Sequence, residues 1–360
     1  MNRPAIFAGF ARAKTCALAL SVAALGIVSV PSAAQFQFVP GQFSNQSVQV
    51  DVIPFEVQNG LIVVKALMGD GLVTSAILDT GLPICVMTTD YAAKHGLKSS
   101  GTKDIPVLDR NETVLNTPPQ AIRINRMLVT SALTGVLDLY SKLSAAPPQD
   151  APPLWIGNSA LAALSYTIDP LNEKITLRPP GAPLPPGAIV VPFELKDGRI
   201  WVDVKVNGKK NFSALIDTGS VGTMLPAKLV KDLALTPSAT FPVTHPDGGA
   251  GKVCAVELAD IAMAGLKVTD VQAIYVDQKS KDGFDPDLGI IGNDVLLRYR
   301  VTIDCMQKKI AFEKYAAPKQ DTIATGGPSR PQNGQLPAGA RPSGQGNTKI
   351  TPLPGRPGGQ

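Results

Sequence analysis

The sequence predicts an all-β chain that consists of two homologous units, each with one or two short helices. Aromatic residues are scarce (5%), whereas Gly (33) and Pro (32) are abundant among the 360 residues, a balance that favours short strands and turns. A second observation is a repeat, in which Ile53-Pro54-Phe55-Glu56 returns as Val191-Pro192-Phe193-Glu194. A third is the pair of turns Asp79-Thr80-Gly81 and Asp217-Thr218-Gly219, which lie the same 138 positions apart and follow apolar segments.

The far ends of the units repeat as well. Ile156-Gly157-Asn158 matches Ile291-Gly292-Asn293, and Thr167-Ile168-Asp169 matches Thr302-Ile303-Asp304, both displaced by 135 positions. A self-similarity of this length predicts two copies of one structural unit. We therefore divide the body of the chain into a first unit, residues 50–178, a Pro/Gly linker, residues 179–187, and a second unit, residues 188–314.

Residues 1–34 have the pattern of an export signal. A positively charged start precedes an apolar run of 15 residues, Cys16 to Val30, and the small residues Ser32-Ala33-Ala34 form a cleavage site. The alternative is a membrane anchor, but a bilayer span needs about 20 apolar residues. We expect a periplasmic or secreted protein without a stable membrane span. The following residues 35–49 form a polar lead with no clear period.

Residues 315–360 are rich in Pro, Gly, Gln and Ser, a composition that predicts a disordered tail. The net charge of +5 comes from the two ends of the chain, because residues 1–34 contribute +3 and the tail contributes +4, which leaves about −2 for the body. A body without a basic surface argues against nucleic acid as a partner.

Within each unit the pattern predicts strands that lead into turns. Residues 61–67 and 200–206 are rich in β-branched residues, Asn207-Gly208 predicts a two-residue hairpin turn, and a strand at 212–216 leads into the second Asp turn. Short helices are expected at residues 88–95, 159–164, 226–233 and 294–297.

Asp79 and Asp217 are the candidate catalytic residues. Two carboxylates held about 3 Å apart share a proton, because they cannot both ionise comfortably. One can then activate water while the other protonates the carbonyl oxygen under attack. Glycine leaves room for two such loops to approach across a local twofold axis, and threonine hydroxyls can hydrogen-bond across it. The expected supports are Thr80, Gly81, Thr218 and Gly219.

These motifs resemble the aspartic peptidases of the pepsin and retropepsin group. The shared pattern is two apolar residues before Asp-Thr-Gly, followed much later by two apolar residues and Gly before a helix. Residues 289–296 and 300–304 look especially like bacterial retropepsin-type aspartyl proteases. The resemblance covers about 265 residues, and it implies two retropepsin-like β-barrel lobes in a pepsin-like bilobal arrangement. It also implies a peptide or protein substrate, no metal and no cofactor.

The resemblance further implies supports and flaps. The hydroxyl of Ser220, after the second turn, is expected to bond a catalytic carboxylate, whereas Leu82 occupies the same place after the first turn and lacks a hydroxyl. A lost bond to the charged form predicts raised pKa values in the pair and activity nearer neutral pH. The expected flap lies at Asp247, Gly248, Gly249 and Ala250, beside His245, and the corresponding place in the first unit is residues 108–113.

Three cysteines remain after removal of the signal: Cys85, Cys254 and Cys305. The odd number means that at least one thiol stays free or pairs between chains. Cys85 lies close to the first Asp turn but has no obvious His partner, so we expect a buried, inert thiol.

We expect an exported aspartic endopeptidase that works as a monomer, in which the two units pair within one chain. Pairing of units between two chains is the alternative arrangement. Two other functions are open from the sequence: a non-catalytic, bilobal, peptide-binding protein of the cell envelope, and an envelope scaffold that acts through its Pro/Gly-rich tail.

Overall fold

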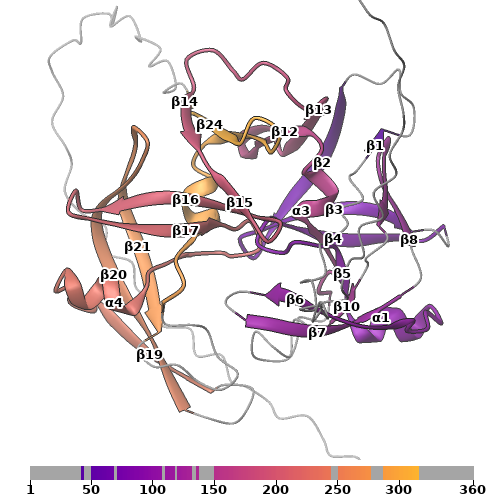
Figure 1. The fold of residues 1–360 in the computed structure, drawn as a ribbon, viewed down its shortest axis with the longest axis horizontal. Coiled ribbons are helices and arrows are strands. Elements are labelled where there is room, and N and C mark those ends of the chain that lie inside the picture. Colours follow the sequence, from indigo (N-terminus) through magenta and orange to yellow (C-terminus); the bar gives the residue numbers. More distant parts are fainter. Residues whose placement is uncertain are drawn as a thin grey trace, which may run out of the picture. The chain divides into compact units, whose positions relative to one another are not determined.

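The computed structural model describes residues 42–43, 50–68, 71–107, 110–117, 120–131, 135–137, 150–244, 250–276 and 287–315. The predicted export signal and nearly all of the predicted tail lie outside these residues. Strands dominate the described part of the chain and its helices are short (Figure 1). The all-β prediction is therefore confirmed. No helix among the described residues has the length and apolar character needed to cross a membrane.

The first half begins with a pair of hairpins. Asn59 and Gly60 both have positive φ (51° and 81°), as a two-residue turn between strands requires. In chain order the elements of this half are β1 (Gln42–Phe43), β2 (Asp51–Gln58), β3 (Leu61–Met68), β4 (Val73–Asp79), β5 (Val86–Met87), α1 (Thr89–Lys94), β6 (Gly101–Val107), β7 (Arg110–Asn116), β8 (Gln120–Ile124), β9 (Met127–Ser131), β10 (Gly135–Val136), β11 (Leu154–Gly157), α3 (Asn158–Leu161), β12 (Ser165–Asp169), the 3₁₀ helix η1 (Pro170–Asn172) and β13 (Lys174–Arg178).

The second half has elements in a similar order. They are β14 (Ile189–Pro192), β15 (Glu194–Lys196), β16 (Arg199–Val206), β17 (Lys210–Ile216), β18 (Thr223–Met224), α4 (Ala227–Asp232), β19 (Ala239–Thr244), β20 (Ala250–Met263), β21 (Leu266–Val276), β22 (Ile290–Ile291), α5 (Asn293–Leu296), β23 (Arg300–Asp304) and β24 (Lys309–Glu313). The four predicted helices correspond to α1, α3, α4 and α5.

Two details differ from the sequence-based expectations. The hairpin at Asn207-Gly208 exists, but its turn has three residues, because Val206 pairs with Lys210 and the Lys209 N–H closes the turn on the Val206 oxygen at 2.9 Å. In addition, Gln42–Phe43, within the predicted polar lead, forms β1 and pairs with β9.

Each strand that carries an Asp turn has a parallel neighbour from much later in the same half. β4 pairs with β11 so that Asp79 lies opposite Gly157, and β17 pairs with β22 so that Ile216 lies opposite Ile291. These parallel pairs explain the repeated Ile-Gly-Asn. The segment lies directly beside the Asp turn in both halves.

Strands of both halves join in one antiparallel sheet, in the order β14-β24-β23-β12-β13-β2. β12 and β23 form its centre, where Thr167 pairs with Thr302 and their hydroxyl oxygens lie 2.8 Å apart. The two halves are thus connected by backbone hydrogen bonds between β12 and β23.

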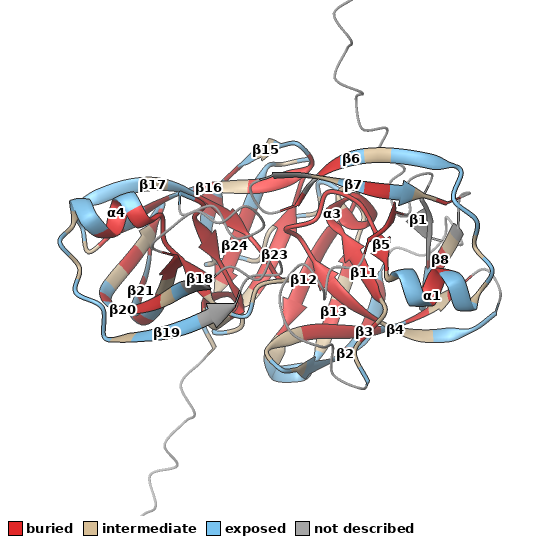
Figure 2. Cartoon of the chain, turned by 90° about the horizontal axis from the view of Figure 1, so that it is seen from below, coloured by how far each residue is buried: buried red, intermediate tan, exposed pale blue. Residues whose placement is uncertain are grey.

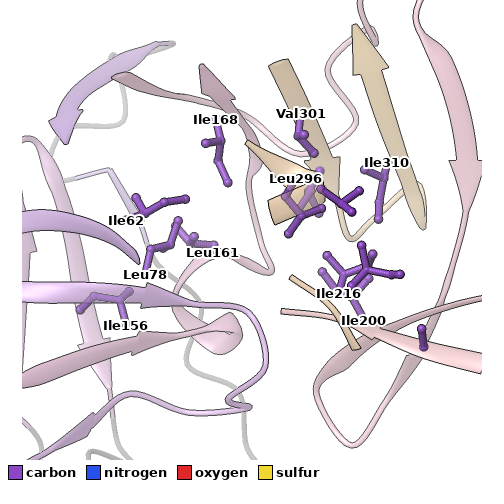
Figure 3. Close-up of a cluster of buried hydrophobic side chains, with 14 of the residues drawn as sticks. Ile62, Leu78, Ile156, Leu161, Ile168, Ile200, Ile216, Leu296, Val301 and Ile310 are labelled. Carbon is purple, nitrogen blue, oxygen red and sulfur yellow. The ribbon is translucent and has the colours of Figure 1, made fainter. Parts of the chain in front are cut away.

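The buried side chains form a hydrophobic cluster that extends through both halves. Figure 2 shows buried residues (red) along β12 and β23, where the halves meet. The cluster lies between the joining sheet and the Asp-bearing strands, and Figure 3 labels members from the two halves: Ile62, Leu78, Ile156, Leu161, Ile168, Ile200, Ile216, Leu296, Val301 and Ile310. Burial of this apolar surface holds the strands that carry the Asp turns in a common frame.

The three cysteines of the described chain are free and buried. Burial raises the pKa of the Cys85 thiol to about 11 and that of Cys305 to about 12. A thiol with such a pKa is protonated near neutral pH, so Cys85 is a poor nucleophile despite its place near the first Asp turn.

Candidate active site

The two Asp turns meet through their threonines. The Thr80 hydroxyl donates to the Ile216 oxygen at 2.8 Å and accepts from the Thr218 N–H at 3.1 Å. The Thr218 hydroxyl donates to the Leu78 oxygen at 2.8 Å and accepts from the Thr80 N–H at 3.1 Å. Both threonines are fully buried. Four hydrogen bonds therefore link the first turn to the second, and each bond has a counterpart across a local twofold axis.

The glycines of the turns lie against the opposite carboxylates. A Cβ atom added to Gly81 would lie 2.5 Å from Cγ of Asp217, and one added to Gly219 would overlap the carboxylate of Asp79. These distances are shorter than any van der Waals contact, so only glycine fits at either position. Each carboxylate thus covers the glycine of the other turn, which places Asp79 and Asp217 face to face.

The carboxylates are held by backbone N–H groups. Oδ1 of Asp79 accepts from the N–H of Gly81 at 2.9 Å and from that of Leu82 at 3.1 Å. Oδ1 of Asp217 accepts from the N–H of Gly219 at 2.8 Å. The two side chains also share a hydrogen bond with each other.

Burial raises the pKa of both carboxyl groups, since Asp79 is 8% exposed and Asp217 is 5% exposed. The charge of Asp217 raises the pKa of Asp79 further. For Asp217 the effect of burial is partly offset by the Gly219 N–H, by the hydrogen bond from Asp79 and by the positive charge of Arg199. At the pH where the first proton has left, the pair carries one negative charge and one proton.

Ser220 is placed differently from the expectation. Its hydroxyl donates to the Gly222 oxygen at 2.9 Å, so it stabilises the loop after the turn rather than the Asp217 carboxylate. The pKa of Asp79 is raised, which is the direction expected beside Leu82, but its causes are burial and the charge of Asp217. The Leu82 backbone N–H bonds to Asp79 whatever the side chain is, and its buried side chain packs in the core.

The flap residues are only partly described. Asp247, Gly248, Gly249 and His245 lie outside the described residues, while Ala250 begins β20. β19 and β20 form a hairpin in which Thr244 pairs with Ala250. The equivalent hairpin of the first half is β6–β7, in which Val107 pairs with Arg110. Of the place predicted for the first flap, residues 110–113 lie in β7, and residues 108–109 lie outside the described residues.

Two asparagines form cross-connections that the sequence reasoning did not assign. Nδ2 of Asn158 donates to the Gly198 oxygen at 2.8 Å, and Nδ2 of Asn293 donates to the Gly60 oxygen at 2.8 Å. Nδ2 of Asn293 also donates to the Thr218 oxygen at 2.8 Å. The signal was present in the sequence, because the asparagines and both glycines repeat in register.

Arg199 is a further residue near the site that sequence reasoning missed. It lies next to Gly198 at the start of β16 and is 6% exposed. Leu61 holds the matching position in the first half, so no repeated pattern drew attention to the arginine. Among the described residues, no three His, Cys, Asp or Glu side chains gather in a way that could hold a metal ion.

A family model supports the resemblance over part of the chain. The family model described as aspartyl protease matches residues 202–295, from within β16 through the second Asp turn to α5. Among solved structures, that of the aspartic proteinase from Irpex lacteus has a TM-score of 0.44 and 13% identity over 74% of this chain and 97% of that chain. No curated protein matches significantly. The predicted resemblance to aspartic peptidases is confirmed for residues 202–295, the part of the chain that the family model matches.

Proposed function

We propose that this protein is an exported aspartic endopeptidase, with Asp79 and Asp217 as its catalytic pair and water as the nucleophile. The observation that carries the proposal is the reciprocal arrangement of the two turns, in which each carboxylate lies over the glycine of the other turn. Two carboxyl groups held this closely share a proton, which is the condition for simultaneous general base and general acid catalysis.

The chemistry needs one charged and one protonated carboxyl group. The charged carboxylate takes a proton from water while the water oxygen bonds to the carbonyl carbon of the peptide, and the protonated carboxyl gives its proton to the carbonyl oxygen. The carboxyl that took the proton from water then gives it to the amide nitrogen, while the other carboxylate takes a proton from one hydroxyl of the tetrahedral diol and the C–N bond breaks. The products are a carboxylic acid and an amine, and the pair again holds its one proton on the carboxyl that held it at the start.

The threonine and asparagine bonds contribute by holding both carboxylates in place. A catalytic group that is displaced by about 1 Å loses around 10²-fold in rate. The backbone N–H groups that bind each carboxylate are fixed by the same turns, so the pair is oriented before the substrate arrives.

The proposal is tested by comparing the mature chain with its Asp79→Asn and Asp217→Asn variants on a mixed peptide library between pH 3 and 8. Each variant is expected to lose at least about 10³-fold in kcat/KM, because each removes one half of the acid–base pair. Pepstatin should inhibit the unmodified protein. Full activity in either variant would contradict the shared pair.

The competing function is that of a non-catalytic, peptide-binding, bilobal protein of the cell envelope. The family match favours it in one respect, since residues 202–295 include the second Asp turn but not the first. Binding of peptides by the unmodified protein, without cleavage at any pH tested, would establish this alternative and reject the peptidase.

Export and a monomeric state belong to the same proposal. Sequencing the N-terminus of the protein recovered from the envelope or the medium should place cleavage after Ala34. Analytical ultracentrifugation should give the mass of one chain, because the described cross-bonds between the two turns are all made within one chain. An uncleaved N-terminus or a dimer would contradict these two parts separately.

A further inference from the structure

A buried arginine distinguishes the second half of the molecule from the first. Arg199 begins β16, and its guanidinium carbon lies 5.4 Å from the centre of the Trp201 ring. Burying a cation is costly unless opposite charge or an aromatic face compensates it. An arginine in this position therefore calls for a negatively charged neighbour.

The strand register supplies that neighbour. β16 and β17 are antiparallel, and Trp201 pairs with Leu215. Arg199 and Asp217 lie two positions further along this register, just beyond the last paired residues, since β17 ends at Ile216. The positive charge of Arg199 acts on the Asp217 carboxylate, which agrees with this placement.

The turn before Arg199 is also tied to the other carboxylate. The Gly198 oxygen accepts from Asn158, the Asn158 N–H donates to the Leu82 oxygen at 2.7 Å, and the Leu82 N–H donates to Asp79. This chain of bonds fixes where β16 begins relative to the pair of carboxylates. The position of Arg199 is thus determined by both halves.

The first half offers no cation at the equivalent place. Val63 pairs with Ile77 in the β3–β4 hairpin, so the same extension brings Leu61 opposite Asp79. The positive charge of Arg199 is among the main influences on the pKa of Asp217, whereas the main influences on the pKa of Asp79 are burial, Asp217 and backbone N–H groups. The electrostatic environment of the pair is therefore one-sided.

We propose that Arg199 is a positioning residue that holds the negative charge of the pair on Asp217 and the shared proton on Asp79. Asp217 is then the base that takes the proton from water, and Asp79 is the acid that protonates the carbonyl oxygen. The inference rests on the proposed peptidase function for its catalytic meaning, but the distribution of charge exists without turnover. Burial raises the pKa of Asp217, and the positive charge of Arg199 opposes that rise, which agrees with this assignment.

The direct test is an NMR titration of the full mature chain labelled with ¹³C at the aspartate side-chain carboxyls. The Asp79→Asn variant gives the pKa of Asp217 alone, and the Asp217→Asn variant gives the pKa of Asp79 alone. If the proposal holds, the pKa of Asp217 is the lower of the two. Adding Arg199→Met should raise the pKa of Asp217 more than that of Asp79, because it removes a positive charge that acts on Asp217.

Two controls separate charge from packing. Arg199→Lys keeps the charge and should leave the titration of Asp217 nearly unchanged, whereas Leu61→Met changes packing at the matching position of the first half without changing charge. Arg199→Gln replaces Arg199→Met if the latter does not fold, as judged by circular dichroism. An equal shift of both carboxyls in the neutral variant, or a shift with Arg199→Lys as large as with Arg199→Met, would overturn the inference.

The pH dependence of kcat/KM should shift in the same direction as the pKa of Asp217. In Arg199→Met the acidic limb of the kcat/KM profile should move to higher pH, with a fall of about tenfold on the acidic side. A uniform fall at all pH values would indicate a purely structural role and overturn the inference. A protein that shows the asymmetric titration but cleaves no peptide would reject the proposed function alone.

Discussion

The two Asp turns differ, but for another reason than the one that their sequences suggest. The sequence marks the first turn as the weaker one, because Leu82 stands where the second turn has Ser220. In the structure backbone N–H groups hold both carboxylates, while the Ser220 hydroxyl bonds elsewhere. The difference between the turns arises instead one strand away, where the positive charge of Arg199 acts on Asp217. A carboxylate is supported by the backbone around it and by its cross-strand neighbour more than by the next side chain.

The largest effects are expected at the glycines, where the two turns are equal. Gly81→Ala and Gly219→Ala should each lower kcat/KM by about 10²-fold or more, because the added methyl group displaces the opposite carboxylate. Gly222→Ala is the matched control, since a Cβ there meets no atom within 4 Å. Peptide cleavage assays give the comparison. Normal activity in one of the two variants would break the equivalence of the turns.

The threonines should come next, again with equal effects. Thr80→Val and Thr218→Val each leave a buried carbonyl oxygen and a buried N–H without their partner, which should cost about 2–4 kcal/mol of unfolding free energy. The double variant should lose less than the sum, because both hydroxyls belong to one network. Urea denaturation measures these energies, and the Thr→Ser variants serve as controls. Additive losses would show that the four bonds act independently.

The asparagines should reveal a difference between the halves. Asn293→Ala leaves two carbonyl oxygens without their donor, that of the buried Thr218 and that of the half-buried Gly60, whereas Asn158→Ala leaves only that of the buried Gly198. We expect Asn293→Ala to be the more destabilising variant by about 1 kcal/mol in urea denaturation. Equal losses would mean that the bond to Thr218 contributes nothing.

The raised pKa values of the pair predict how stability depends on pH. When the pKa of a folded-state carboxyl exceeds its unfolded value, the folded state binds more protons between the two values, so stability falls as pH rises through that window. Asp79→Asn removes this penalty. It should therefore gain stability over the unmodified protein at pH 7 and lose that gain below about pH 4. Thermal unfolding at both pH values measures the difference in stability between Asp79→Asn and the unmodified protein. A variant that is more stable at low pH as well would contradict the raised pKa of Asp79.

The smallest effect is expected at Ser220. Its hydroxyl bonds the Gly222 oxygen, so Ser220→Ala should cost about 1 kcal/mol or less and leave the pH profile of kcat/KM in place. A displaced acidic limb in this variant would show that the hydroxyl acts on Asp217 after all.

Much of the fold could be predicted from local patterns. The alternation of apolar residues, the Asn-Gly turns and the helix-ending signals depend on neighbours within a few positions, and they placed α1, α3, α4, α5 and the strands around the Asp turns within about three residues at each end. The hairpin at Asn207 was predicted with the wrong turn length, because register depends on pairing along whole strands.

The sequence by itself determined the repeat, the two Asp-Thr-Gly turns and the Ile-Gly-Asn segments, because these depend on residue identity and spacing. The tertiary structure alone decided which groups meet. Asn158 reaches Gly198 and Asn293 reaches Gly60 across the halves, and the charge of Arg199 acts on Asp217. Such contacts join residues that are distant along the chain or have no counterpart in the repeat. The effect of these contacts on the two carboxylates therefore appears only once the strands are assembled.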